Sequence, residues 1–121
     1  MTVTRHTSDI IDMTSLDEIP GATVVRHLGT ISLHVIKETL ALREAGGMAR
    51  FLQQFITDVH SLARAQAAAR GGAAVVSMRV RRLWARDSPG RNQGQALVTL
   101  TGDVVDVHYH AAPPQMHESE V

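Results

Sequence analysis

The 121-residue chain has the size of a single domain, carries twelve basic and twelve acidic residues, and is 44% hydrophobic but only 3% aromatic. Its zero net charge provides no overall field to attract nucleic acid or an anionic membrane, so such binding would need a local patch. Cysteine is absent, which excludes disulfides and a cysteine nucleophile, and neither a signal peptide nor a membrane-length apolar stretch is present, so we expect a cytoplasmic protein.

The two ends of the chain are polar and carry residues that interrupt regular structure. Residues 1–20 contain only scattered apolar positions and run into Pro20-Gly21, which predicts a flexible leader. Residues 111–121 begin with Ala-Ala-Pro-Pro and continue as a polar run, which predicts a flexible tail. The ordered domain is therefore expected to span residues 21–110.

The first part of this domain is rich in β-branched and aliphatic residues. Thr23–Leu28 and Thr30–Glu38 are predicted as two strands, with Gly29 as a bend or bulge between them. Within the second run apolar and polar residues alternate, as expected of a strand that buries one face.

An amphipathic helix is the strongest signal in the chain. From Met48 to Arg70, apolar residues recur at steps of three and four, and an alanine-rich end favours the helix further. Gly71-Gly72 then supplies the positive φ with which helices commonly end. The apolar stripe consists of Met48, Phe51, Leu52, Phe55, Ile56, Val59, Leu62 and Ala63.

Two further extended runs, Ala73–Ala85 and Gln95–Tyr109, follow the helix and are separated by the turn cluster Asp87-Ser88-Pro89-Gly90. The order of elements is therefore ββαββ. This order predicts an α+β fold in which one long helix packs on a small, mainly antiparallel sheet.

The predicted helix and sheet differ in size. Residues 48–70 would form a helix roughly 34 Å long, whereas a typical strand covers about 17–20 Å, so the helix should extend beyond the sheet. One helix also covers only one sheet face, yet several apolar residues indicate that the second face is partly apolar: Val25, Ile36, Val75, Leu97 and Val105. Because most soluble oligomers are symmetric assemblies of one chain, we predict a homo-oligomer.

Several short pieces in this region occur in an order typical of one family. They are Leu-Arg-Glu-Ala-Gly-Gly from residue 42, Phe51-Leu52, Phe55-Ile56, Gly-Gly-Ala-Ala-Val-Val-Ser from residue 71, Arg-Asn-Gln-Gly-Gln from residue 91 and Thr-Gly-Asp-Val-Val from residue 101. Through them, the stretch from Ile19 to Val107 resembles the C-terminal domain of the C2 domain-containing protein 5 family.

The same region is more distantly similar to the bacterial YbjQ-like domains, in which an Ala/Gly-rich helix end leads into an Ala-Val-Val strand. This resemblance implies a YbjQ-like α+β fold and a closed ring, expected to be a pentamer. Those bacterial domains also carry a heavy-metal-binding label, although we match none of their motifs to histidines of this chain. The likeness to the C2-domain family implies a scaffold role related to membrane trafficking, but it does not imply calcium binding, which belongs to a separate N-terminal C2 domain.

The last strand carries a candidate metal site. Asp106, His108 and His110 alternate along it, so their side chains would share one face and could bind zinc or another transition metal, with His117 or Glu118 as a further ligand. The alternative is a solvated strand end, and this is the interpretation we favour, so no cofactor is expected.

A basic arm surrounds the single tryptophan. Arg79, Arg81, Arg82, Arg86 and Arg91 flank Trp84, and this combination could bind anionic lipid headgroups or nucleic-acid phosphates. The neutral chain favours instead an exposed or inter-subunit face. Nucleic-acid binding is therefore not expected, whereas peripheral lipid contact stays open.

No pattern of a nucleophile beside a base is present, so we do not expect an enzyme. The predicted function is an oligomerisation or scaffold domain, with further copies of the chain and other proteins as its partners. The candidate interaction residues are Phe51, Phe55, Arg79, Arg81, Arg82 and Trp84.

Overall fold

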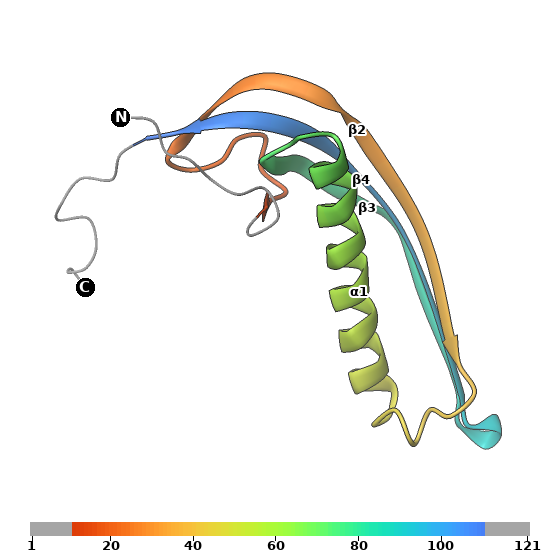
Figure 1. The fold of residues 1–121 in the computed structure, drawn as a ribbon. Coiled ribbons are helices and arrows are strands. Elements are labelled where there is room, and N and C mark those ends of the chain that lie inside the picture. The colour runs from red at the N-terminus through yellow and green to blue at the C-terminus, as the bar shows by residue number, and fades with distance from the viewer. Residues whose placement is uncertain (1–10, 111–121) are drawn as a thin grey trace, which may run out of the picture.

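A single helix lies along the inner side of an arched, four-stranded sheet in the computed structural model, which describes residues 11–110 (Figure 1). The sheet has the strand order β1-β3-β4-β2. The central strand β4 pairs antiparallel with both β2 and β3, and β1 pairs parallel with β3. The predicted α+β class with one helix is therefore confirmed, and the sheet is mixed but mainly antiparallel. The elements are β1 (Asp12–Met13), β2 (Ala22–Thr39), α1 (Met48–Ala69), β3 (Ala74–Ser88), a 3-10 turn (Pro89–Arg91) and β4 (Gln93–Tyr109).

The extended segment before the helix is one strand and not two. β2 runs without a break from Ala22 to Thr39 and pairs with β4 along its length. Gly29 does mark an irregularity, because it adopts φ +120° where the register shifts between His27 and Gly29. A bulge of this kind bends a strand without ending it, so the prediction of two strands here is wrong. The first strand, β1, comes instead from residues 12–13, within the predicted leader.

Residues 11–20 pack against the sheet. Ile11 and Ile19 are buried, and the backbone N–H of Thr14 donates to the carbonyl of Val75. Part of the predicted leader therefore belongs to the packed domain, since its apolar residues cover strand β3. The remaining leader, residues 1–10, and the predicted tail, residues 111–121, lie outside the described residues.

The sheet is longer than the helix. At about 1.5 Å per residue, the 22 residues of α1 span roughly 33 Å. At about 3.3 Å per residue, strands of 15 to 18 residues span roughly 50–60 Å. The expectation that the helix extends beyond the sheet is therefore wrong, because it assumed strands of typical length. The consequence is similar, since one helix leaves much of the sheet uncovered.

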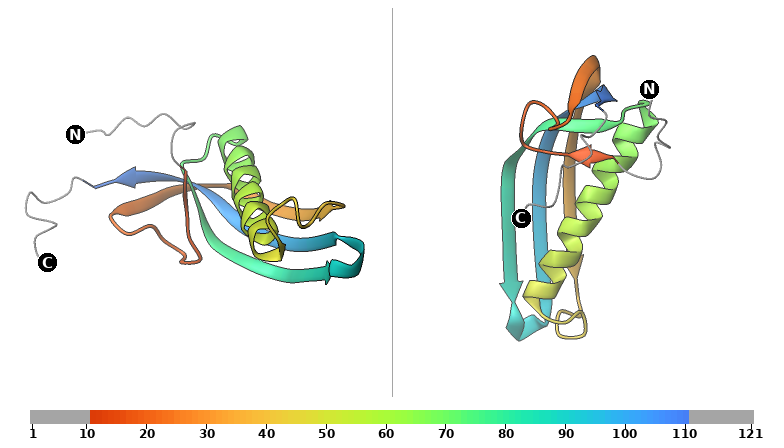
Figure 2. Two further views of the ribbon diagram at one scale, coloured as in Figure 1. Left: turned by 90° about the horizontal axis from the view of Figure 1, so that it is seen from below. Right: turned by 90° about the vertical axis from the view of Figure 1, so that its left-hand side faces the viewer.

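The helix crosses the strands obliquely (Figure 2). Its buried residues follow one another at steps of four, and each such step advances the side chain by about 40° around the helix axis. The contact stripe therefore winds around α1, which leaves two apolar side chains outside it, Ile56 with 41% and Leu62 with 45% of its surface exposed. The buried helix residues are Phe51, Phe55, Val59, Ala63 and Ala67.

Phe51 and Phe55 therefore lie in the core and not on an interaction surface as predicted, because they belong to the helix stripe that faces the sheet. Their surroundings come from β2, β4 and the loop before the helix: Ile31, Leu33, Leu42, Ala96, Val98 and Leu100 belong to the same buried cluster. A second, smaller cluster lies on the other sheet face and contains Ile19, Ala74, Val76 and Val105. Successive side chains of a strand point to opposite faces, which explains the two clusters: Val75 and Val104 point into the main core, and their chain neighbours point to the other face.

We predict that Phe55→Ala lowers the free energy of unfolding by about 3–5 kcal/mol, because this ring is fully buried and its removal leaves a cavity between helix and sheet. Urea denaturation followed by circular dichroism measures the change. Gln53→Ala, at an exposed position of the same helix, should change the free energy by less than about 0.5 kcal/mol. Equal effects of the two substitutions would contradict the position of this core.

Candidate functional site

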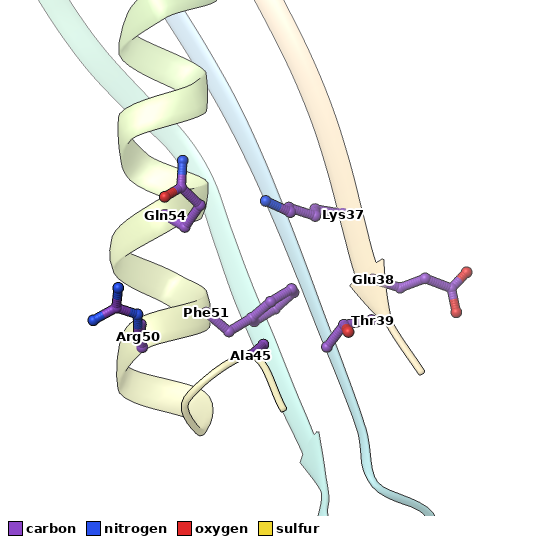
Figure 3. A pocket seen from close by; sticks show the side chains of 7 residues that line it. All are labelled: Lys37, Glu38, Thr39, Ala45, Arg50, Phe51 and Gln54. Atoms are coloured by element: carbon purple, nitrogen blue, oxygen red, sulfur yellow. The ribbon is translucent and has the colours of Figure 1, made fainter. Parts of the chain in front are cut away.

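A pocket of about 220 Å³ lies between the start of α1 and the end of β2 (Figure 3). Lys37 extends from β2 toward the helix, whereas Glu38, the next residue, points away from it. The Lys37 Nζ donates to the Asp58 carboxylate at 2.8 Å and lies 5.9 Å from the centre of the Phe51 ring. This lysine therefore already has an anionic partner within the protein. Its bond to Asp58 joins β2 to α1 beside the pocket.

Lys37 and Gln54 hold Asp58 in its charged form. The Lys37 hydrogen bond is the largest cause that lowers the pKa of the Asp58 carboxyl below its usual range, and the hydrogen bond from Gln54 Nε2 adds to it. Because the carboxylate accepts both bonds, protonation of Asp58 weakens this contact between α1 and β2.

The candidate metal ligands lie at the end of β4. Asp106 forms an ion pair with Arg26 at 3.6 Å, and the Nε2 of His110 lies 2.7 Å from the Thr23 hydroxyl. The rings of His108 and His110 are 6.2 Å apart, centre to centre. Within residues 11–110 no three His, Cys, Asp or Glu side chains group closely enough to hold a metal ion. Metal binding here stays an untested alternative to the solvated strand end, and the other candidates, His117 and Glu118, lie outside the described residues.

The candidate arginines lie mainly on the sheet face opposite the helix. Val80 pairs with Leu100 and Leu83 with Val98, so two residues of β3 stand opposite the single Thr99 of β4. This bulge places Arg82 on the open face, where simple alternation would have placed it on the face of Val80. Arg79 pairs with Thr101 on that face, and the Nε of Arg81 donates to the Thr101 hydroxyl at 3.1 Å.

Trp84 lies in a short apolar row on the same open face. Ile36 and Trp84 both pair with Leu97, from its two sides, and have 66% and 46% of their surface exposed. We call Ile36, Leu97 and Trp84 the open-face row. Three neighbouring apolar side chains on adjacent strands form a continuous patch, which is typical of a surface that contacts another protein.

A second apolar surface lies on the helix side of β3. Val80 and Leu83 are exposed there beside a groove of about 280 Å³. Ile56 lies one helical turn before His60, which lines this groove, so the exposed isoleucine continues the same surface. We call it the helix-side groove; its lining consists of Met13, Thr14, Ser15, His60, Met78, Val80 and Leu100.

The edges of the sheet add to these surfaces. β2 pairs with β4 on one side only, and β1 covers β3 only at Ala74 and Val75. The segment after β1 extends this cover slightly, because the N–H groups of Ser77 and Met78 donate to Leu16 and Thr14. From Arg79 to Ser88 β3 pairs with β4 on its inner side, and no described strand lies on its outer side, so this edge can pair with another chain.

These features define the chain as an α+β domain with a half-covered sheet and apolar surfaces on both faces of its edge strand. The chain belongs to the family of the C2 domain-containing protein 5 C-terminal domain, since the family model described as "C2CD5, C-terminal domain" matches residues 13–107. This finding confirms the resemblance that the sequence shows. Within residues 11–110 no helix is both long and apolar enough to cross a membrane.

Relatives in vertebrates support the assignment. The C2 domain-containing protein 5 of Homo sapiens is 42% identical over 101 residues, which cover 84% of this chain and 10% of the relative. The Mus musculus protein is 42% identical over 99 residues, 82% of this chain and 10% of the relative. The chain therefore spans about a tenth of the length of the curated relatives it matches.

A crystal structure from Pediococcus pentosaceus shows a similar fold. It is a protein of unknown function from the DUF74 family, and it superposes with a TM-score of 0.55 at 10% identity over 80% of this chain and 97% of its own. At this identity the likeness concerns the fold alone.

We predict that Lys37→Met raises the pKa of Asp58 toward its ordinary value, because the largest stabilising contact of the carboxylate is lost. The lowered pKa of Asp58 stabilises the folded protein at pH values above the pKa of this carboxyl in the unfolded chain. This stabilisation is lost as the pH falls through the pKa of Asp58 in the folded protein. The variant should therefore be less stable than the wild type at neutral pH, and the two should converge in acid.

An NMR titration of the Asp58 carboxyl and denaturation across acidic pH measure both effects. Arg26→Met, which removes the other described ion pair, is the control and should leave the Asp58 pKa unchanged. An unaltered Asp58 pKa in Lys37→Met would refute this account of the contact.

Proposed function

We propose that this domain is a non-enzymatic self-assembly module whose copies form a closed ring. The observation that supports the proposal is the pair of apolar surfaces on the two faces of β3, the open-face row and the helix-side groove. Trp84 and Ile36 of one copy would pack into the groove of the next, beside its exposed Val80 and Leu83. Both partners lose water-exposed apolar surface in this contact, which is the main favourable term in association.

The two surfaces differ in shape and composition, which favours a head-to-tail arrangement. A two-fold dimer uses the same patch on both subunits, whereas a contact between two different patches repeats from copy to copy and closes into a ring when the rotation allows. The YbjQ-like resemblance makes five subunits the ring size we propose. Zero net charge is compatible with such packing, because no strong repulsion between copies opposes it.

In a longer protein such a ring would bring several attached modules together. The relatives that carry this region are about ten times longer than the matched part, and their name refers to a C2 domain. We propose a clustering or scaffold role on this basis, related to membrane-trafficking proteins with C2 domains and located in the cytoplasm.

We predict that native mass spectrometry at micromolar concentration detects a homo-oligomer, and that Trp84→Ser and Leu83→Ser each weaken it by about tenfold or more. Burial of an aromatic or aliphatic anchor at the centre of an interface commonly contributes this much. Leu40→Ser removes an exposed leucine outside both surfaces and is the matched control, which should assemble as the wild type does.

Mixing the two variants tests the head-to-tail contact itself. Trp84→Ser keeps an intact groove and Leu83→Ser keeps an intact open-face row, so the mixture should form one-to-one heterodimers at a concentration at which each variant alone is monomeric. A monomeric wild type would overturn self-assembly, and a mixture that stays monomeric would overturn this particular contact.

A further inference from the structure

A polar pocket of about 310 Å³ lies on the open sheet face. Three strands contribute to it, because β2, β4 and β3 lie side by side there and β3 is irregular at Ser77, whose φ is +54°. Its volume is at the lower end of the range for small-molecule sites. The lining consists of Thr30, Ser77, Arg79, Arg81, Thr101, Gly102 and Asp103.

The guanidinium groups of Arg79 and Arg81 line this pocket, and each has N–H donors that are not used in the hydrogen bonds described next. The Nη1 of Arg79 donates to the carbonyl of Ser15 at 2.8 Å and to that of Met78 at 3.0 Å, and the Nε of Arg81 donates to the Thr101 hydroxyl. The Nε and Nη2 of Arg79 and both terminal nitrogens of Arg81 make none of these bonds. Within residues 11–110 the ion pairs involve other residues, Arg26 with Asp106 and Lys37 with Asp58, so neither guanidinium has a carboxylate partner there.

The other side of the pocket accepts hydrogen bonds. The Oδ1 of Asp103 accepts from the Thr30 hydroxyl at 3.0 Å, which orients the carboxylate at the wall of the pocket. Thr101 accepts from Arg81, so the proton of its own hydroxyl is available to an acceptor. The pocket thus presents two cations and hydroxyl donors on one side and an anionic acceptor on the other.

We infer that this pocket binds a small phosphorylated polyol. Planar guanidinium groups match phosphate oxygens with paired donors, and the Thr101 hydroxyl would complete the contact with the phosphoryl group. Asp103 would accept from hydroxyl groups of the polyol. Inorganic phosphate has no polyol hydroxyls, and its negative charge is repelled by this carboxylate, so the polyol part is needed for tight binding.

Features of the chain argue against two other anionic partners. Single-stranded nucleic acid is held by aromatic platforms along a basic groove, whereas Trp84 and Tyr109 of this face are far apart along the sheet: Trp84 pairs with Leu97, twelve positions before Tyr109 in β4. An acidic protein segment would not use Asp103, which repels its carboxylates. The phosphorylated polyol can be a free metabolite or the headgroup of a lipid, since both present the same chemistry.

The experiment is a calorimetric titration of the full chain with myo-inositol 1-phosphate and, separately, with inorganic phosphate. We expect saturable binding of one inositol phosphate per chain, at least about tenfold tighter than that of inorganic phosphate. Equal affinity for both ligands, or no saturable heat with the inositol phosphate, would overturn the proposal.

Two double variants separate a defined site from general charge. Arg79→Gln with Arg81→Gln should weaken binding of the inositol phosphate by about tenfold or more, since charged hydrogen bonds are lost. Arg86→Gln with Arg91→Gln removes the same charge outside the pocket and should leave the affinity unchanged. An equal loss in the two double variants would show nonspecific attraction and refute the site.

Vesicles identify the source of the ligand. Phosphatidylcholine vesicles with and without phosphatidylinositol 4-phosphate are sedimented with the wild type and with the Arg79/Arg81 double variant. Headgroup-dependent binding that this variant loses would assign the pocket to a lipid, and soluble binding without vesicle binding would assign it to a metabolite. Preference for poly-glutamate over the inositol phosphate would overturn both in favour of an acidic protein.

Discussion

The contact between α1 and the sheet determines what the rest of the surface can do. Its buried residues follow at steps of four, so the stripe winds around the helix and α1 crosses the strands at an angle. A helix of roughly 33 Å laid obliquely on strands of 50 Å or more covers only part of one face. Ile56, Leu62, Val80 and Leu83 are left exposed by this geometry, and within residues 11–110 no α-helix covers the opposite face. The surfaces available for contacts thus follow from the packing of the core.

Patterns with a strong period could be predicted from the sequence. The helix was expected at 48–70 and is found at Met48–Ala69, because its apolar residues follow the helical period and two glycines end it. A turn was expected at residues 87–90, since Pro and Gly limit the backbone there; the structure has it slightly later, at Pro89–Arg91, because β3 continues to Ser88. The division into strands before the helix was not predicted correctly, because a glycine within a strand indicates a break and a bulge equally well. At Gly29 the chain forms a bulge and not a break, because β2 pairs with β4 on both sides of this residue.

The surfaces were harder to predict than the elements. Phe51 and Phe55 were candidates for an interface, yet position on the stripe alone cannot tell whether the sheet of the same chain or a second copy covers them. The pair Arg81-Arg82 did carry a signal, because two consecutive polar residues interrupt the alternation of a strand. Such an interruption is what a bulge produces, and here it places both arginines on the open face. The burial of Ile11 and Ile19 had no comparable signal, since isolated apolar residues in a polar segment show no period.

The central claim is that the exposed apolar surfaces of this domain are covered by another copy. Trp84 is the one tryptophan of the chain and belongs to the open-face row, so its fluorescence reports on that surface directly. Acrylamide quenching of this fluorescence is measured from nanomolar to tens of micromolar protein. The account predicts that quenching decreases and the emission shifts to shorter wavelength as concentration rises. Quenching and emission that stay at the values of the monomeric Leu83→Ser variant throughout would contradict it.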